Sequence, residues 1–265
     1  MATKFISRFA PSPTGRLHLG HAWSALRGFD AARVAGGRFV LRIEDIDTAR
    51  CRAEFIDAIF EDLRWLGLSW DGEVMLQSNR GAAYGEALAA LDSMGLIYRC
   101  RCSRSDFAAS APQGDGAPLY PGTCRTRNHD ASVAHCWRLD VAKATARVGM
   151  MPLAEDIVIA RKDALASYHL AVVVDDAAQG VTHIVRGRDL LPVLPVHNLL
   201  QRVLGFPVPT YDHHAMIVGP DGMRLAKRRG SISLAALREA GMNSEELITK
   251  MRSGRFPIGF AIEST

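Results

Sequence analysis

Two histidines near the N-terminus are placed where a nucleotide phosphate could bind. The string Arg8-Phe-Ala-Pro-Ser-Pro-Thr-Gly-Arg-Leu-His18-Leu-Gly20-His21 follows a short apolar run and opens a helical pattern. A helix that starts beyond the carboxyl end of a strand presents backbone N–H groups and its positive dipole end to an anion. His18 and His21, three residues apart, can then both point at a phosphate. Taken alone, the motif also fits ordinary core or surface histidines.

A basic loop far downstream could act on the same phosphates. Arg224-Leu-Ala-Lys227-Arg-Arg-Gly230 follows the turn sequence Gly219-Pro-Asp-Gly222. A basic loop that ends in glycine suits a mobile clamp on a triphosphate, with Lys227 as a point charge. By itself the loop fits a nucleic-acid patch or a solvated turn equally well.

Three cysteines and a tyrosine form a possible metal site. They occur as Cys100-x-Cys102 and Tyr120-x-x-x-Cys124. Zinc prefers thiolates in closed tetrahedral sites, and a tyrosinate is an unusual but feasible fourth ligand. From the cysteines alone, the expected fourth ligand is a histidine, either His129 or His135. Any zinc bound here would be structural.

The elements that must position these residues alternate between strand and helix. Such alternation predicts a doubly wound α/β fold with a parallel sheet and right-handed crossovers. The apolar patterns predict strands at Phe5–Ala10, Arg38–Ile43, Val74–Gln77, Asp156–Arg161, His169–Val174 and Thr182–Val185. They predict helices from Leu19, from Ala53, and over Tyr84–Met94, Asp189–Leu204, Ser233–Ala240 and Ser244–Met251. A hairpin is expected between Tyr211–Val218 and Met223–Leu225, and Arg255–Thr265 shows no pattern.

This order of elements suggests four segments. They are the first half of the catalytic domain (1–98), an inserted zinc-binding module (99–152), the second half (153–205), and the Lys-loop with a short helical region (206–265). The sequence contains no apolar run near the ~20 residues of a membrane-spanning helix and no apolar stretch typical of a signal peptide, so we expect a cytosolic protein. The net charge of +4 permits a polyanionic partner without requiring one.

The two phosphate-directed segments together resemble those of class I aminoacyl-tRNA synthetases. Two longer strings narrow the resemblance to the glutamyl branch of that family: Arg8-Phe-Ala-Pro-Ser-Pro-Thr-Gly and Leu41-Arg-Ile-Glu-Asp-Ile-Asp-Thr48. The similarity extends from about Phe5 to Gly230, nearly the whole chain. The Lys-loop departs from the family's Lys-Met-Ser-Lys-Ser form, because Arg224 and Ala226 replace the first Lys and the Ser, whereas Lys227 matches the second Lys.

The resemblance implies an ATP site and a glutamate site. It places ATP on His18, Gly20, His21 and Lys227, with catalytic roles for the two histidines and the lysine. For glutamate, it implies that Arg8 receives the side-chain carboxylate and that Ala10 and Ser12 line the same wall. It further implies that Glu44 and Tyr168 face the amino group and that Arg186 lies beside the substrate.

Within the glutamyl branch, the chain resembles the stand-alone glutamyl-queuosine tRNA(Asp) synthetases. It ends at Thr265, soon after the Lys-loop, where ordinary glutamyl-tRNA synthetases continue into an anticodon-binding domain. This likeness implies Tyr120 as the fourth zinc ligand, beside Cys100, Cys102 and Cys124. It implies activation of L-glutamate with ATP and Mg²⁺, and transfer to the queuosine base of tRNA(Asp) by a monomer.

Three other functions remain open at this stage. A truncated glutamyl-tRNA synthetase would charge the 3′ end of tRNA(Glu). A non-catalytic paralogue would only bind tRNA. An unrelated nucleotidyltransferase would share the His-x-Gly-His motif but not the residues of the glutamate pocket.

Overall fold

The computed structural model describes residues 4–103, 105–110, 119–127, 129–219, 232–257 and 259–263. The chain divides into two compact units. Unit 1 contains Met1–Asn79, Gln179–Pro192 and Pro209–Thr265, and unit 2 contains Arg80–Ala178 and Val193–Val208. Each unit is built from separate stretches of the sequence, so the units do not correspond one to one with the four continuous segments expected from the sequence. The division into those four segments remains a prediction.

Unit 1 is built on parallel strands. β1 (Ile6–Phe9) pairs with β2 (Arg38–Ile43), and β2 pairs with β3 (Met75–Leu76), each in parallel. β2 carries five consecutive buried residues, as expected for a strand that is covered on both faces. The strands expected at Phe5–Ala10, Arg38–Ile43 and Val74–Gln77 are thus confirmed, with the first and third shorter than expected.

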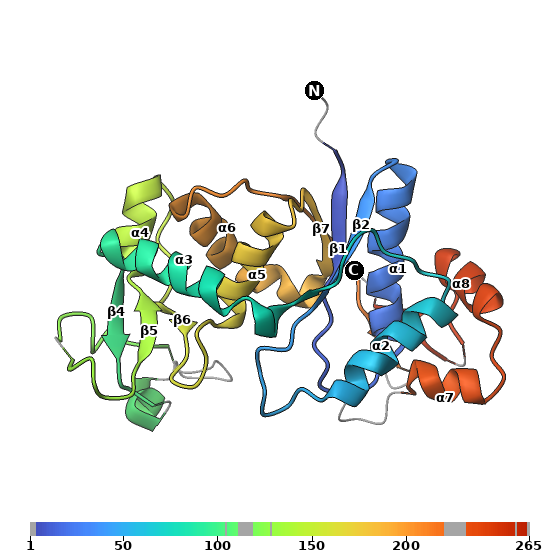
Figure 1. The fold of residues 1–265 in the computed structure, drawn as a ribbon, viewed down its shortest axis with the longest axis horizontal. Helices are drawn as coiled ribbons and strands as arrows, with labels where there is room; N and C mark the ends of the chain where they lie inside the picture. The colour runs from blue at the N-terminus through green and yellow to red at the C-terminus, as the bar shows by residue number, and fades with distance from the viewer. Residues whose placement is uncertain are drawn as a thin grey trace. The chain divides into compact units, whose positions relative to one another are not determined.

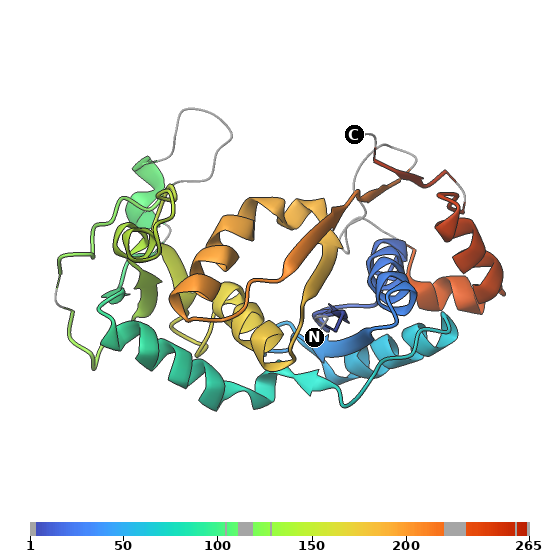
Figure 2. The same ribbon diagram turned by 90° about the horizontal axis from the view of Figure 1, so that it is seen from above.

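A second parallel pair continues the sheet on the other side of β1. β7 (His183–Gly187) pairs in parallel with β8 (Thr210–His214), seen side by side in Figure 2. The amide N–H of Thr182 donates to the carbonyl oxygen of Ile6 at 2.9 Å, which places β7 next to β1 (Figure 1). The chain therefore runs from β1 to β2 and β3 on one side and returns to β7 and β8 on the other. In open parallel sheets, ligands bind beyond the carboxyl ends of the strands at such a reversal.

The helices of unit 1 cover this sheet with apolar faces. They are α1 (Leu19–Val34), α2 (Ala53–Trp65), α7 (Leu234–Glu239) and α8 (Ser244–Arg252). Gly28 of α1 packs closely on β2, because an added Cβ there would lie 3.3 Å from Cε2 of Phe39 and would require that ring to shift. Side chains from β1, β2 and all four helices share one hydrophobic core.

Unit 2 combines an antiparallel sheet with four helices. The sheet has the order β4 (Ile97–Cys100), β5 (Cys136–Leu139) and β6 (Ile157–Ala160). The helices are α3 (Gly81–Ser93), α4 (Val141–Val148), α5 (Tyr168–Ala178) and α6 (Leu194–Val203). We expected the strand at Asp156–Arg161 to open the second half of the parallel sheet, but β6 pairs antiparallel with β5 instead.

The prediction of a strand at His169–Val174 is wrong, because these residues belong to α5. Three consecutive valines favour a strand locally, and a short apolar run cannot be assigned to strand or helix by periodicity alone. α5 is buried over most of its surface, so the apolar residues need no single face. The buried carboxylate of Asp175 is satisfied by the Tyr84 hydroxyl at 2.8 Å and by Arg80 Nε at 3.1 Å.

Two other boundaries differ from the prediction. The helix expected over Asp189–Leu204 begins as a 3₁₀ turn, Arg188–Val193, with Pro192 inside it. The expected strand Tyr211–Val218 is split, because β8 pairs with β7 whereas β9 (Ile217–Val218) pairs antiparallel with β10 (Ala261–Ile262) in the unpatterned tail. The second hairpin strand, Met223–Leu225, and most of the preceding turn lie outside the described residues.

Within the described part of the chain, no helix is long and apolar enough to cross a membrane.

One buried carboxylate links α2 to α7. Asp62 is fully buried, and its Oδ1 lies 3.4 Å from the Arg238 guanidinium, while its Oδ2 is buried without a hydrogen-bond partner. Burial raises the pKa of Asp62 to about 6, although the charges of Arg238 and Arg16 oppose this shift. A carboxyl with a raised folded-state pKa takes up protons on folding, so its contribution to stability falls as the pH rises from about 4 to about 6.

Replacing this carboxyl by an amide should therefore stabilise the protein in neutral and alkaline solution. We expect Asp62→Asn to raise the free energy of unfolding by about 1 to 3 kcal/mol at about pH 8 and to change it little at about pH 3.5, because wild-type Asp62 is then mostly protonated in both states. Urea unfolding at both pH values measures the difference.

A control variant is Glu61→Gln, at the exposed partner of Arg238. It should change the free energy of unfolding by less than about 0.5 kcal/mol. An Asp62→Asn protein that is less stable at about pH 8 would show that the Arg238 ion pair outweighs the burial cost.

Candidate active site and metal centre

The two histidines of the first motif cap helix α1. His18 is the N-cap, and its Nδ1 accepts from the backbone N–H of Gly20 at 3.1 Å. The backbone N–H of His18 in turn donates to Nδ1 of His21 at 3.1 Å. The arrangement is a capping box made by two imidazoles, whose ring centroids lie 3.9 Å apart.

The capping box fixes the tautomer of both rings. Because each Nδ1 accepts a hydrogen bond, a neutral ring must carry its proton on Nε2. His18 and His21 thus have Nε2–H groups as donors at the start of a helix. Both the donor chemistry and the helix dipole at this position favour an anion.

The segment that follows the Lys-loop is attached to the same capping box. Ser233 forms an antiparallel bridge with His18, and the backbone N–H of Leu234 donates to the Leu17 carbonyl oxygen at 2.8 Å. Lys227 itself lies outside the described residues, as do Arg224 and Ala226. It stands six residues before Ser233, and a fully extended chain of that length spans at most about 20 Å.

Two arginines lie near the carboxyl ends of adjacent strands. Arg8 on β1 and Arg186 on β7 are 7% and 4% exposed. A guanidinium N–H of Arg8 lies 3.5 Å from the carbonyl oxygen of Val185, the residue before Arg186, so the two side chains emerge from neighbouring positions. Charged groups this deeply buried need partners, and a carboxylate substrate suits their bidentate geometry.

The Pro-rich turn after β1 is attached to the end of β2. The backbone N–H of Glu44 donates to the carbonyl oxygen of Pro11, between the candidate wall residues Ala10 and Ser12. Ala10 is half-buried, whereas Ser12 is exposed. These residues belong to unit 1, together with His18, Gly20 and His21.

A buried arginine that sequence reasoning missed contacts Glu44. Arg42 is 0% exposed, and its guanidinium lies 3.3 Å from Glu44 Oε1 and donates to Gln179 Oε1 at 2.9 Å. The Glu44 carboxylate is therefore held by a desolvated cation at the end of β2. The sequence does contain a signal for this contact. Arg42 is a charged residue within the apolar run Arg38–Ile43, and a charge that is buried in a strand must be paired.

Tyr168, the last of the expected glutamate residues, is the first residue of α5 and belongs to unit 2. We expected it beside a strand end. Its ring packs against those of His169 and His197, with centroids 5.6 Å away in each case. His169 Nδ1 and His197 Nε2 are 3.2 Å apart, so the three rings form one cluster.

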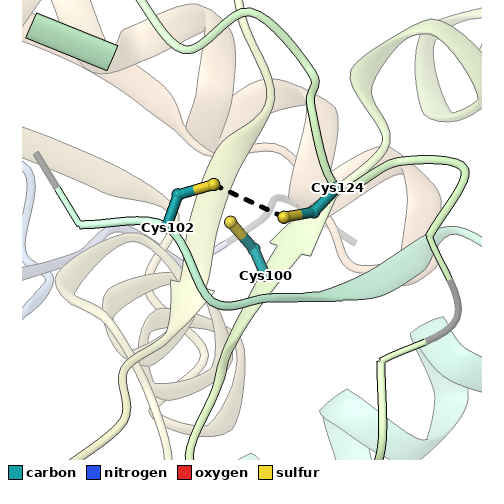
Figure 3. Close-up of side chains that lie close together, drawn as sticks. All are labelled: Cys100, Cys102 and Cys124. Carbon is teal, nitrogen blue, oxygen red and sulfur yellow. Dashed lines mark hydrogen bonds between the residues drawn. The ribbon is translucent and has the colours of Figure 1, made fainter. Parts of the chain in front are cut away.

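The three cysteines expected to bind metal converge in unit 2 (Figure 3). The Sγ atoms of Cys100, Cys102 and Cys124 all lie within 4.8 Å of one another, and those of Cys102 and Cys124 are 3.4 Å apart. The Tyr120 hydroxyl lies 3.5 Å from Cys100 Sγ and accepts from the Cys124 backbone N–H at 2.8 Å. Among the described residues, no histidine or carboxylate belongs to this group.

The ionisation of these thiols is unequal in the absence of a cation. A hydrogen bond from Cys136 is the main cause that lowers the pKa of Cys100 to about 4. Burial and the hydrogen bond with Cys124 raise the pKa of Cys102 to about 12. Several thiolates cannot share this space unless a cation compensates them, and a divalent metal does so.

The chain belongs to the family of class I glutamyl and glutaminyl tRNA synthetases. The family model described as "tRNA synthetases class I (E and Q), catalytic domain" matches residues 4–259. The α/β fold, with its parallel strands and its helix-capping histidines, agrees with this membership.

Relatives of two kinds resemble the chain closely. It is 46% identical to the glutamyl-Q tRNA(Asp) synthetase of Rhodobacter capsulatus, over 91% of this chain and 98% of that protein. It is 43% identical to the glutamyl-Q tRNA(Asp) synthetase of Symbiobacterium thermophilum, over 91% of this chain and 83% of that protein. It is 40% identical to the glutamate–tRNA ligase of Oleidesulfovibrio alaskensis, over 93% of this chain and 56% of that protein.

The fold is shared with solved glutamate–tRNA synthetases. That of Elizabethkingia anophelis superposes with a TM-score of 0.69 at 27% identity, over 86% of this chain. The chain spans about half the length of that enzyme, since the match covers 53% of it.

The glycine between the two capping histidines should be essential for their geometry. A Cβ at Gly20 would lie 3.0 Å from Cε1 and 3.1 Å from Nδ1 of His18. We expect Gly20→Ala to displace that ring and to lower kcat/KM for ATP at least about tenfold, which corresponds to ~1.4 kcal/mol. The melting temperature should not fall much, because alanine favours a helix by up to about 1 kcal/mol over glycine.

A matched control for this prediction is Gly85→Ala in α3, where an added Cβ meets nothing within 4 Å. It should stabilise the protein and leave the reaction unchanged. Wild-type kcat/KM in Gly20→Ala would show that the His18 ring position is not needed.

Proposed function

We propose that this protein activates L-glutamate with ATP and transfers it to the queuosine base of tRNA(Asp). One observation carries the proposal. A capping box of two Nε2–H imidazoles stands beyond β1, in a chain whose similarity to glutamyl-Q tRNA(Asp) synthetases extends over about nine-tenths of its length.

In the first step, the α-carboxylate oxygen of glutamate attacks the α-phosphorus of ATP. The bond to the bridging oxygen breaks, pyrophosphate leaves, and glutamyl-adenylate remains. No protein nucleophile is required, so the protein contributes positioning and electrostatic stabilisation. His18 and His21 donate from Nε2 to phosphate oxygens, and Lys227 neutralises charge on the leaving pyrophosphate. Mg²⁺ bound with ATP shields the remaining phosphate charge.

The glutamate pocket follows from the charges at the strand ends. Arg8 receives the side-chain carboxylate, and Arg186 lies beside the substrate. The Glu44 carboxylate, oriented by buried Arg42, accepts from the α-ammonium group. Ala10 and Ser12 line the wall near Arg8, while the role expected for Tyr168 at the amino group stays a prediction. Burial strengthens these charge-assisted contacts relative to those in water.

In the second step, a hydroxyl of the queuosine cyclopentene ring attacks the activated carbonyl of the adenylate. The ester bond forms, AMP leaves, and the hydroxyl proton is released. We expect the protein to do this as a monomer, which light scattering coupled to size exclusion would test.

The proposal is tested in two stages with purified protein, ATP and Mg²⁺. Glutamate-dependent ATP–pyrophosphate exchange should occur without tRNA, and Lys227→Ala should reduce it at least about tenfold, or ~1.4 kcal/mol in the transition state. Labelled glutamate should then be transferred to tRNA(Asp) that carries queuosine and not to unmodified tRNA(Asp).

Mass spectrometry of nuclease fragments identifies the acceptor and separates the alternatives. Glutamate found on the terminal adenosine of tRNA(Glu) would indicate a 3′-end synthetase, like the glutamate–tRNA ligase that is 40% identical. No exchange with any amino acid would indicate a non-catalytic paralogue.

We infer further that Cys100, Cys102, Tyr120 and Cys124 bind a structural zinc ion. The three converging sulfurs and the adjacent phenol supply four ligand atoms of the kind that a closed site needs. The Arg138 guanidinium carbon lies 3.7 Å from the centroid of the Tyr120 ring. Burial and the hydrogen bond with Cys100 raise the pKa of Tyr120, so the phenol needs a bound cation to ionise. Bound zinc would supply the positive charge that lets these ligands ionise together.

Metal content checks this inference directly. Wild-type protein should contain about one zinc per chain by elemental mass spectrometry, and Cys102→Ser should lose most of it, since structural sites need all their ligands. Cys51→Ser, outside the cluster, is the control and should retain the metal.

A second experiment tests the fourth ligand. Tyr120→Phe should weaken zinc binding at least about tenfold in chelator competition, as expected when one ligand is removed. Unchanged affinity in Tyr120→Phe with reduced affinity in His129→Ala would assign the fourth ligand to the histidine.

A further inference from the structure

Arg186 has an imidazole partner on the next strand. In the register of β7 and β8, Arg186 lies opposite His213. The guanidinium Nε donates to His213 Nε2 at 3.1 Å. This bond connects the carboxyl end of β7, where Arg186 is 4% exposed, to a residue outside the expected glutamate pocket.

Two more contacts restrain the same guanidinium. Its Nη2 donates to the carbonyl oxygen of Leu190 at 3.2 Å, and its central carbon lies 4.9 Å from the centroid of the Tyr211 ring. Tyr211 and His213, on the same face of β8, have rings inclined by only 9°. The guanidinium is thus held at Nε by His213, at Nη2 by the Leu190 carbonyl, and on its face by the Tyr211 ring. These three contacts together fix its plane. Removing the contact at Nε would leave rotation about the side-chain torsions much less restricted.

The hydrogen bond requires a neutral His213 with its proton on Nδ1. Protonation would turn Nε2 from acceptor into donor and would place a second cation against Arg186. Four charged or titratable groups influence His213. They are Arg186 on β7, Asp189 on the 3₁₀ turn that follows β7, and Asp212 and His214 on β8. Burial and the charges of Arg186 and His214 lower the pKa of His213, whereas Asp212 and Asp189 raise it. The balance keeps the ring in its accepting form in neutral solution.

We propose that His213 is a positioning residue that holds the Arg186 guanidinium in the orientation needed to bind glutamate. The proposal rests on the proposed function, in which Arg186 lies beside the amino acid. His213 acts through Arg186 and not by contact with the substrate. Its loss should therefore impair the use of glutamate while the use of ATP stays the same.

Two substitutions separate the hydrogen bond from the bulk of the ring. Leucine fills similar space but cannot accept, whereas the amide oxygen of glutamine can replace Nε2 as acceptor. We expect His213→Leu to raise the KM for glutamate about tenfold in ATP–pyrophosphate exchange, with the KM for ATP and kcat within about twofold of wild type. His213→Gln should recover most of the affinity. Asp212→Asn is the control, because Asp212 points to the opposite face and pairs with Arg27 at 3.6 Å.

The pH profile gives a readout that a merely structural role would not change. In the wild type, the KM for glutamate should rise as the pH falls through the His213 pKa, below its usual value of about 6.5. His213→Gln should lack this rise, since an amide does not titrate.

Three outcomes would overturn the proposal. They are a wild-type KM for glutamate in His213→Leu, an equal rise of both KM values in that variant, and a His213→Gln profile that keeps the acid rise. Failure of the proposed function is recognised separately, because wild-type protein would then show no glutamate-dependent exchange at any pH.

Discussion

The candidate site is organised around two hydrogen bonds at the start of α1. The Gly20 N–H donates to His18 Nδ1, and the His18 N–H donates to His21 Nδ1. They satisfy two N–H groups at the start of α1, which the helix cannot satisfy itself, and they do so with groups that also carry ligand-binding chemistry. Because both Nδ1 atoms accept hydrogen bonds, each neutral ring carries its proton on Nε2. The bridge from His18 to Ser233 connects this helix start to the segment that follows the Lys-loop in the sequence.

The proposed glutamate pocket places buried charge at the ends of strands. Arg8, Arg42 and Arg186 are each at most 7% exposed, and desolvating a guanidinium is costly unless partners replace the lost water. Backbone carbonyls, Glu44, Gln179 and His213 supply such partners within unit 1. These contacts restrain the arginine side chains without the substrate, so their orientation becomes as important as their charge. This is why residues without any substrate contact, such as Arg42 and His213, become relevant to specificity.

The cysteine cluster is a separate structure within unit 2. Its side chains come from the end of β4 and from the segment of Tyr120 and Cys124, whose described residues, 119–127, form turns without a helix or strand. Such a segment buries few apolar residues of its own, so a bound metal would supply stability that packing does not. Burial, the hydrogen bond with Cys124 and the charge of Cys100 all raise the pKa of Cys102, so these thiols do not ionise independently.

Features that depend on neighbouring residues could be predicted from the sequence. They include the start of α1 at Leu19, the bounds of β2, the helix expected over Ser233–Ala240 and found at Leu234–Glu239, and the grouping of three cysteines. Helix starts, apolar runs and short ligand spacings are local signals. The sequence also indicated the family, through motifs that the family model then matched. The helix at His169–Val174 and the antiparallel pairing of β6 could not be predicted in this way, because burial on all sides and strand pairing depend on residues distant in sequence. The partners of Arg186 and Glu44 belong to the same category: a side chain's type can be read from the sequence, but what lies across a sheet from it is fixed by register.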